Sequence, residues 1–201
     1  MNRLARALAL ALVLGTLWGC GQQAPELKDA PADGKPNPDL GPVTDIGAYQ
    51  IQPPKGYART DPKFLEPDEF SWEGPRRGEK DGAMFMVKIW PDERAEQPSK
   101  IGVEVATLTL DDYFSSALAR VRPFWVRLQP DPPQRFTSHG LPFIGATWKA
   151  IDRESQRPFR GFLYVTLSGK QVVEITGEDA EPHHDVLLQA AAAAVRTLRK
   201  R

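Results

Sequence analysis

Three histidines are the side chains of this 201-residue chain best suited to proton transfer or metal binding: His139, His183 and His184. Imidazole titrates near neutral pH and is a common metal ligand. His183, His184 and Asp185 are consecutive, and neighbouring helix residues point about 100° apart, so they do not easily chelate one ion. The pattern favours solvated residues in the first turn of a helix. The sequence leaves open whether His139 lies near the other two.

Carboxylate pairs and serines are the other candidates for catalysis. Asp111-Asp112 suits the charged first turn of a helix, and Asp152 and Glu154 flank Arg153 at an expected strand end or hairpin turn. No serine lies in a G-x-S-x-G elbow, and no phosphate-binding glycine loop or zinc-binding cysteine pair is present. The sequence therefore predicts no catalytic residue, no metal site and no cofactor, and we expect a protein that is not an enzyme.

The single cysteine, Cys20, follows a segment with the character of an export signal. Two arginines precede an unbroken apolar run at residues 7–14, which is shorter than the about 20 residues of a membrane-spanning helix. Residues 17–20, Leu-Trp-Gly-Cys, resemble the lipobox of bacterial lipoproteins, although Trp18 is bulkier than the residue usual there. The resemblance implies a signal peptide over residues 1–19 and a lipidated Cys20 with three acyl chains, a firm membrane anchor. The alternative is an ordinary secretory peptide or a short N-terminal anchor.

Residues 20–47 are rich in Pro, Gly, Asp, Gln and Lys and show no apolar period. Prolines fix φ and remove backbone donors, and so polar a segment buries too little apolar surface to offset its ordering entropy. We expect a lipidated cysteine followed by a flexible tether, with a partner-binding tail as the alternative. Residues 48–201 then form a single α+β domain of ordinary size.

Alternating or continuously apolar segments predict the strands of this domain. The expected strands span residues 49–52, 70–73, 82–90, 134–139, 143–152, 159–167 and 171–176. The segment 82–90 is apolar on both faces and is therefore expected to be central. The last two strands flank a glycine turn and should form an antiparallel hairpin.

Two helices complete the predicted domain. The first begins at Thr109 as N-cap, has two aspartates in its first turn and ends near Pro123. The second runs from about His183 to Arg199, and its alanine run suits close packing on a flat sheet. An antiparallel sheet flanked by two main helices makes an α+β fold, an α/β/α sandwich.

The order β-β-β-α-β-β-β-β-α resembles the Mog1/PsbP-like fold, as do the segments Thr109–Phe114, Arg160–Thr166 and Val172–Thr176. The resemblance spans roughly residues 49–198 and consists of element order and residue classes, so it transfers no functional residue. It implies a non-enzymatic domain that works by contacting other macromolecules. Members include photosystem accessory proteins and a regulator of a nuclear transport GTPase.

The distribution of charge and of aromatic residues bears on partners. The chain has 26 Lys and Arg against 26 Asp and Glu, which argues against a nucleic-acid partner. We expect the C-terminal basic residues 196–201 to end the helix through its macrodipole, with lipid headgroups as the alternative contact. Phe124 and Trp125 are candidate partner contacts if they are exposed, and core residues otherwise.

These features together predict a membrane-tethered extracytoplasmic lipoprotein, with the outer membrane favoured, that acts as a non-catalytic interaction or accessory domain. It would be held by its lipid anchor, contact an envelope protein partner and present a surface cleft lined by aromatics. One alternative is a small-molecule or lipid carrier with an apolar pocket between sheet and C-terminal helix. A further alternative is an unrecognised hydrolase in which histidines and carboxylates converge. The sequence leaves open the partner, the ligand and the oligomeric state.

Overall fold

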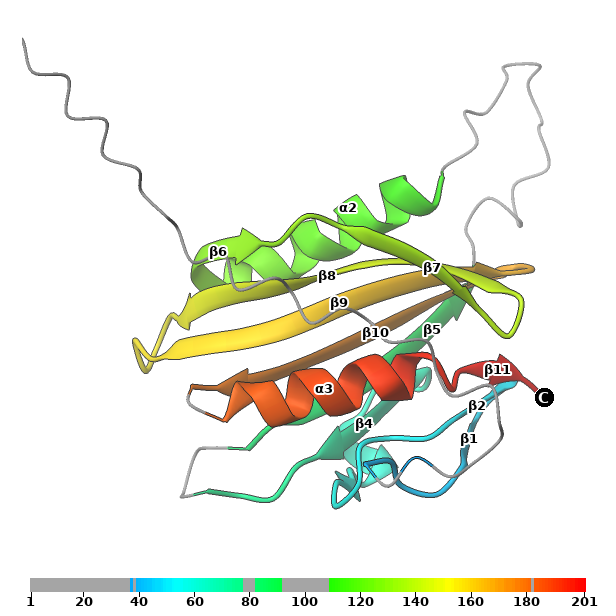
Figure 1. Ribbon diagram of the computed structural model, residues 1–201, viewed down its shortest axis with the longest axis horizontal. Coiled ribbons are helices and arrows are strands. Elements are labelled where there is room, and N and C mark those ends of the chain that lie inside the picture. The colour runs from blue at the N-terminus through cyan, green and yellow to red at the C-terminus, as the bar shows by residue number, and fades with distance from the viewer. Residues whose placement is uncertain (1–36, 38, 78–81, 92–108, 182) are drawn as a thin grey trace, which may run out of the picture.

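The computed structural model describes residues 37, 39–77, 82–91, 109–181 and 183–201. Within them the chain forms an eight-stranded antiparallel sheet with a helix on each face (Figure 1). This is the α+β fold that the sequence predicts. The expected signal peptide, Cys20 and most of the expected tether lie outside the described residues.

The elements have the following bounds. The strands are β1 (Thr44–Ile46), β2 (Tyr49–Ile51), β3 (Ala58–Arg59), β4 (Glu69–Glu73), β5 (Met84–Pro91), β6 (Trp125–Pro130), β7 (Gln134–Ser138), β8 (Leu141–Asp152), β9 (Pro158–Ser168), β10 (Gln171–Ala180) and β11 (Arg199–Lys200). The α-helices are α2 (Leu110–Val121) and α3 (His184–Val195), and the 3-10 turns are η1 (Pro62–Phe64) and η2 (Arg122–Phe124).

The large sheet has the order β3-β4-β5-β10-β9-β8-β6, and β7 also pairs with β8. Strand β5 lies between β4 and β10, which confirms its expected interior place. The β9–β10 hairpin is also confirmed: Ser168 pairs with Gln171, and Gly169 adopts a φ of 65° in the two-residue turn, which a glycine adopts at no steric cost.

Both faces of the central strands are buried, because each face carries a helix. On β9, Phe162 and Tyr164 join the core under α3, while Leu163 and Val165 join a second core under α2. In the first core α3 contributes Leu187, Leu188, Ala191, Ala194 and Val195. These packed side chains occupy the place where the carrier alternative expected an apolar pocket.

Helix α2 begins where its sequence predicts. The Thr109 hydroxyl accepts a hydrogen bond from the Asp112 backbone N–H, and the Asp112 carboxylate accepts one from the Thr109 N–H at 2.5 Å. This reciprocal pair is a capping box, which satisfies two backbone donors that the helix leaves unpaired. Phe114 and Ala117 are the buried residues of the helix, so its apolar stripe faces β8 and β9.

The ends of the folded part differ from the prediction. Leu40 is buried and bridges to Pro54, and β1 pairs with β2, so the tether prediction is wrong for residues 40–47. The β-branched Thr44 and Ile46 form a hairpin across Gly47, whose φ is 64°, despite the prolines just before them.

The C-terminal helix ends at Val195, four residues earlier than predicted. The Thr197 hydroxyl donates to the Ala194 carbonyl oxygen at 2.7 Å and accepts from the Gln52 backbone N–H at 2.8 Å. The chain then turns into β11, where Arg199 pairs with Gln50. Of the basic residues expected to end the helix, only the first therefore lies at its C-cap. Strand pairing with β2 places Arg199 and Lys200 in a three-stranded sheet (Figure 1), and Arg201 follows that strand.

Among the described residues, neither helix has the length and apolar character needed to cross a membrane.

Candidate functional site

The three histidines do not form one site. His183 and His184 begin α3, whereas His139 lies in the turn after β7. The neighbouring Ser138 hydroxyl donates to the Arg196 carbonyl oxygen at the other end of α3. Since a helix of 12 residues is about 18 Å long, the two groups of imidazoles lie far apart. Within the described ranges no group of three or more His, Cys, Asp or Glu side chains could hold a metal ion.

The two aromatic residues proposed as partner contacts, Phe124 and Trp125, differ in their exposure to solvent. Phe124 ends η2 with 70% of its surface exposed, whereas Trp125 is only 8% exposed. The Trp125 ring lies 5.0 Å from the Trp148 ring and 5.2 Å from the Phe159 ring, measured between centroids. Of the two, therefore, Phe124 offers an exposed ring, whereas Trp125 is a core residue, which was the alternative expected from the sequence.

Beside these two residues lies a cleft of about 450 Å³, which we call the aromatic–acidic cleft. The cleft opens on the face of the sheet that carries α2. It lies beyond the C-terminal end of that helix at Val121, where α2 no longer covers strands β5 and β10. Its aromatic wall is made by Phe124, Trp125 and Trp148. Its floor is made by Met84 and Met86 of β5 and by Glu174, Thr176 and Glu178 of β10.

The Trp148 indole reaches the floor because β9 carries a glycine beneath it. A Cβ atom on Gly161 would overlap the Trp148 ring and would lie 2.5 Å from the Gly177 carbonyl oxygen. The absence of a side chain at Gly161 thus leaves room for the Trp148 indole, which lines the cleft.

One carboxylate of the cleft is neutralised by a helix residue. The Glu174 side chain is buried and accepts a hydrogen bond of 2.8 Å from Arg120 of α2. Burial raises the pKa of Glu174, and the nearby Arg120 charge opposes that rise. The Arg120 guanidinium also lies 4.5 Å above the centre of the Trp90 ring, which holds it over the neighbouring strands β5 and β10.

A second carboxyl group, that of Glu178, has no such partner. Burial, and to a smaller extent the nearby charge of Asp152, raise the pKa of Glu178 from 4.5 to about 7. The pKa of Asp152 is itself lowered by hydrogen bonds from the Ser155 hydroxyl and backbone N–H, so Asp152 stays ionised. No hydrogen bond or ion pair joins Glu178 to another side chain in the part of the chain that the structure describes.

The cleft therefore combines aromatic and methionine surfaces with negative charge that the described residues do not balance. Asp152, Glu154 and Glu178 face one guanidinium, that of Arg153, since Arg120 is already paired with Glu174. An organic or side-chain cation would find both a ring face and a carboxylate there. A carboxyl group titrating near neutral pH is also a common acid–base group, although the histidines of the chain lie outside the cleft.

Sequence reasoning did not identify Arg120, Glu174 or Glu178. On β10, Glu174 lies between Val173 and Ile175, and Glu178 falls on the same face as Glu174, which is the pattern of a strand with one solvated face. A signal was present in the neighbouring strand, where Met84 and Met86 lie on the same face and are apolar. Where polar residues of one strand pair with apolar residues of the next, as Glu178 does with Met84, the shared face of the sheet is expected to be partly covered by other residues rather than fully exposed to solvent.

Comparison with known proteins supports the fold of this chain and assigns no function. No family model and no curated protein sequence matches the chain. Among solved structures, LpqN of Mycobacterium tuberculosis, described as involved in cell envelope biogenesis, has a TM-score of 0.54 at 8% identity, covering 83% of this chain and 86% of that one. Cyanobacterial PsbP (CyanoP) of Synechocystis has a TM-score of 0.52 at 12% identity, covering 84% and 96%.

A protein of Bacteroides thetaiotaomicron gives a TM-score of 0.48 at 11% identity, and this chain, with 80% of its residues aligned, spans about half (48%) of its length. At these identities the likeness to LpqN and CyanoP shows the fold alone. It confirms the PsbP-like architecture that the sequence predicts, a mostly antiparallel sheet with two helices.

Proposed function

We propose that this protein is a membrane-tethered, extracytoplasmic lipoprotein whose folded domain is a non-catalytic accessory module that binds a partner protein through the aromatic–acidic cleft. The observation that carries the proposal is the exposed Phe124 ring at the mouth of a cleft that holds an unbalanced carboxyl group, that of Glu178. The predicted lipobox at Cys20 supports the location, and an envelope role of LpqN is compatible with it.

The chemistry of the cleft indicates what the partner presents. Aromatic anchors at a rigid, partly dry surface contribute a large share of binding energy in protein interfaces. A Lys or Arg side chain entering the cleft would meet the Trp148 ring and the Glu178 carboxylate together. Because a cation favours the ionised form of Glu178, binding should lower its pKa and should tighten as pH rises toward 8.

Site-specific photo-crosslinking tests the proposal. A photoreactive amino acid replaces Phe124 in the full chain, expressed in its native envelope. The matched control replaces Phe64 of η1, which is 74% exposed but is not part of the cleft. We expect one defined protein adduct from position 124 and none from position 64, and less adduct when Glu178→Gln is added.

Tethering is tested in the same experiment by Cys20→Ala, which removes the proposed lipid site. We expect the adduct at position 124 to weaken because the domain is no longer concentrated at the membrane. Equal adducts from positions 124 and 64, or an adduct indifferent to Glu178→Gln, would contradict the cleft as the binding surface.

A small-molecule carrier is the second candidate function, and the volume of the cleft favours it. About 450 Å³ lies within the roughly 300–1,000 Å³ of ordinary ligand sites. This function predicts that native mass spectrometry of the purified full chain finds a bound organic cation, lost in Glu178→Gln. A ligand-free mass together with the crosslink at position 124 would favour the accessory module.

A further inference from the structure

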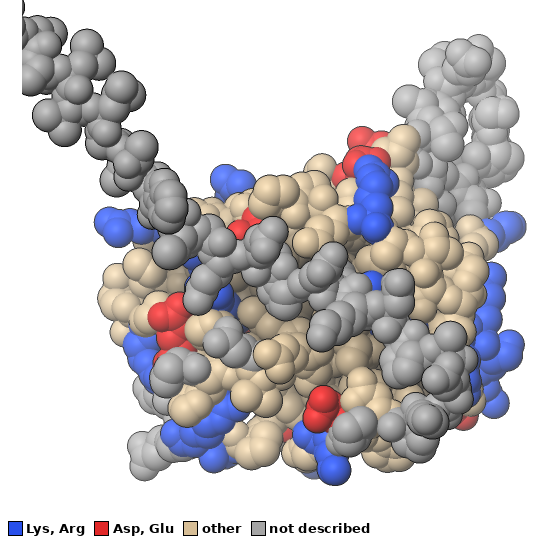
Figure 2. Space-filling view, viewed as in Figure 1, with Lys and Arg blue, Asp and Glu red and all other residues tan. Residues whose placement is uncertain are grey.

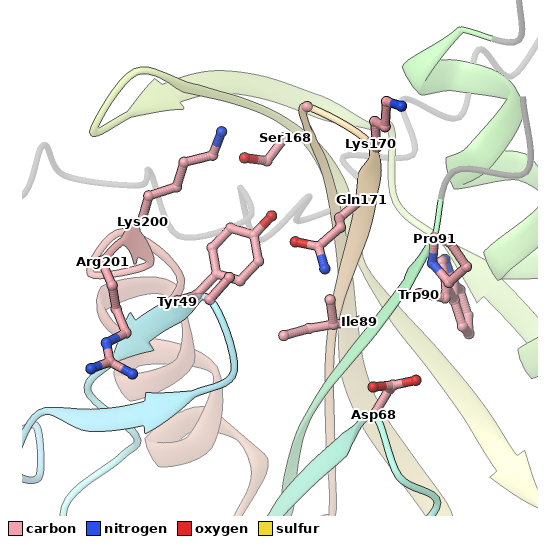
Figure 3. Close-up of a pocket in the computed structure, with 12 residues that line it drawn as sticks. Tyr49, Asp68, Ile89, Trp90, Pro91, Ser168, Lys170, Gln171, Lys200 and Arg201 are labelled. Atoms are coloured by element: carbon pink, nitrogen blue, oxygen red, sulfur yellow. The ribbon is translucent and has the colours of Figure 1, made fainter. Parts of the chain in front are cut away.

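A second pocket, of about 620 Å³, lies at the opposite end of β10 from the aromatic–acidic cleft and shares no lining residue with it. It forms where β2, β5, β11 and the β9–β10 turn meet (Figure 3). Segments about 150 residues apart in the chain contribute to it, since β2 and β11 are paired there. We call it the hydroxyl pocket, after Tyr49 and Ser168.

Two side chains that line this pocket carry a buried hydroxyl group without a hydrogen-bond partner in the described part of the chain. Tyr49 is 1% exposed and Ser168 is 5% exposed, and neither hydroxyl oxygen has a hydrogen-bond partner among the described residues. Figure 3 shows both hydroxyls pointing into the same space. A buried polar group without a partner lowers stability, so two such groups converging on one pocket indicate a ligand that accepts hydrogen bonds from them.

The charges around the pocket favour an anion. Lys170, Lys200 and Arg201 line it against a single carboxylate, that of Asp68, which lies at the far end beyond Ile89 (Figure 3). Arg201 is 3.7 Å from Asp45, while no ion pair joins either lysine to a residue that the structure describes.

Lys200 is the cation whose side chain extends toward the Ser168 side of the pocket (Figure 3). A Cβ atom on Gly169 would lie 3.9 Å from the Lys200 ammonium nitrogen, so this ammonium stands beside the β9–β10 turn. In Figure 3 it points toward the Ser168 hydroxyl, whereas the Lys170 ammonium points away. Figure 2 shows Lys and Arg side chains along the right-hand edge of the molecule, and Figure 1 marks the C-terminus on the same side.

From this convergence we propose that the hydroxyl pocket binds a phosphate-type oxyanion, with the Tyr49 and Ser168 hydroxyls donating hydrogen bonds and Lys200 supplying the charge. Each ionised oxygen of a phosphate group accepts several hydrogen bonds and carries a negative charge, which suits two hydroxyl donors and an ammonium group. Either a free phosphate compound or the headgroup of a phospholipid offers this chemistry. The proposed phosphate site does not depend on the aromatic–acidic cleft, because the two share no lining residue. The experiments below therefore test it separately from the proposed function.

Phosphate binding is measured by isothermal titration of inorganic phosphate into the full chain carrying Cys20→Ala, which no lipid can modify. We expect saturable binding that weakens about tenfold in Tyr49→Phe and in Ser168→Ala, since each removes one hydrogen bond to a charged group. Lys200→Gln should weaken it by a similar factor and flatten its dependence on salt. Thr166→Val is the matched control, because Thr166 carries another buried hydroxyl without a described partner but lies outside the pocket.

Thermal unfolding supplies an independent readout. Without phosphate, Tyr49→Phe, Ser168→Ala and Thr166→Val should each be at least as stable as wild type, because each removes an unpaired buried hydroxyl. With phosphate, the Tm of wild type and of Thr166→Val should rise, and that of the two pocket variants should rise less. Absence of saturable binding in wild type, or equal affinity in wild type and both pocket variants, overturns the site.

Vesicle flotation distinguishes the two sources of phosphate. Binding of the same chain to phosphatidylglycerol vesicles, reduced by Tyr49→Phe and by competing inorganic phosphate, assigns the site to a lipid headgroup. Saturable phosphate binding with no difference between phosphatidylglycerol and neutral vesicles assigns it to a free phosphate compound.

Discussion

Replacement of Glu178 by glutamine should change how the stability of the protein depends on pH. Burial and, to a smaller extent, the Asp152 charge raise the pKa of this carboxyl group from 4.5 to about 7, so the folded state keeps its proton where the unfolded state has lost it. Below pH 4.5 both states are protonated and the group adds no pH dependence. Between pH 4.5 and 7 the stability of the wild type falls as pH rises, and above pH 7 the loss is complete.

The size of this loss follows from the pKa change. At about 1.36 kcal/mol for each pKa unit the full value is about 3 kcal/mol, and partial solvent access to the cleft reduces it to about 2 kcal/mol. Glu178→Gln keeps the shape of the side chain without the charge. We therefore expect the variant to match wild type near pH 5 and to exceed it by about 2 kcal/mol at pH 8, or roughly 4–8 °C in Tm.

Urea unfolding of wild type and Glu178→Gln at pH 5, 6, 7 and 8 measures the difference. Glu154→Gln is the control, because Glu154 lines the same cleft but is exposed, and its curve should run parallel to that of wild type. In Asp152→Asn the midpoint of the Glu178 transition should move to lower pH without vanishing, since burial is the larger cause. Parallel curves for wild type and Glu178→Gln from pH 5 to 8 would refute the reasoning.

Three further substitutions test other contacts. Gly161→Ala should lower the free energy of unfolding by about 2–3 kcal/mol and alter tryptophan fluorescence, because its Cβ would displace the Trp148 ring; a loss under about 0.5 kcal/mol would contradict this. Arg77→Ala should cost about 3 kcal/mol in urea unfolding, because it leaves the buried Asp179 carboxylate without the guanidinium 2.9 Å away, and unchanged stability would show that water replaces it. Phe124→Ala should stay within about 0.5 kcal/mol of wild type, and a larger loss would mean that its exposed ring packs against the domain.

The elements that the sequence predicts well are those with local signals. Helix α2 carries its capping residue, its first-turn acids and its apolar stripe within 12 residues of one another, so no distant contact is needed to define it. The β9–β10 hairpin has the same property, with β-branched residues on both sides of Gly169. Both elements form where the pattern placed them.

The elements that the sequence does not predict depend on residues that are distant in the chain. Strand β11 consists of Arg199 and Lys200, two good helix formers, and it is extended only because it pairs with β2. The cleft was not predicted for a related reason. The glutamates of β10 become buried only when Trp148 and the C-terminal end of α2 pack beside them. Burial of this kind is a property of the assembled layers and leaves no mark on the strand itself.

The pairing of β2 with β11 also governs the order in which the chain can fold. Gln50 and Arg199 are 149 residues apart, and their side chains are joined by hydrogen bonds of 3.2 Å. The hydroxyl of Thr197, two residues after the end of α3, accepts a hydrogen bond from the Gln52 backbone N–H. If the chain is exported N-terminus first, as the proposed signal peptide implies, β2 and β11 cannot pair until Arg199 has crossed the membrane. The domain would then complete its folding only on the far side, where the proposed lipid anchor would hold it.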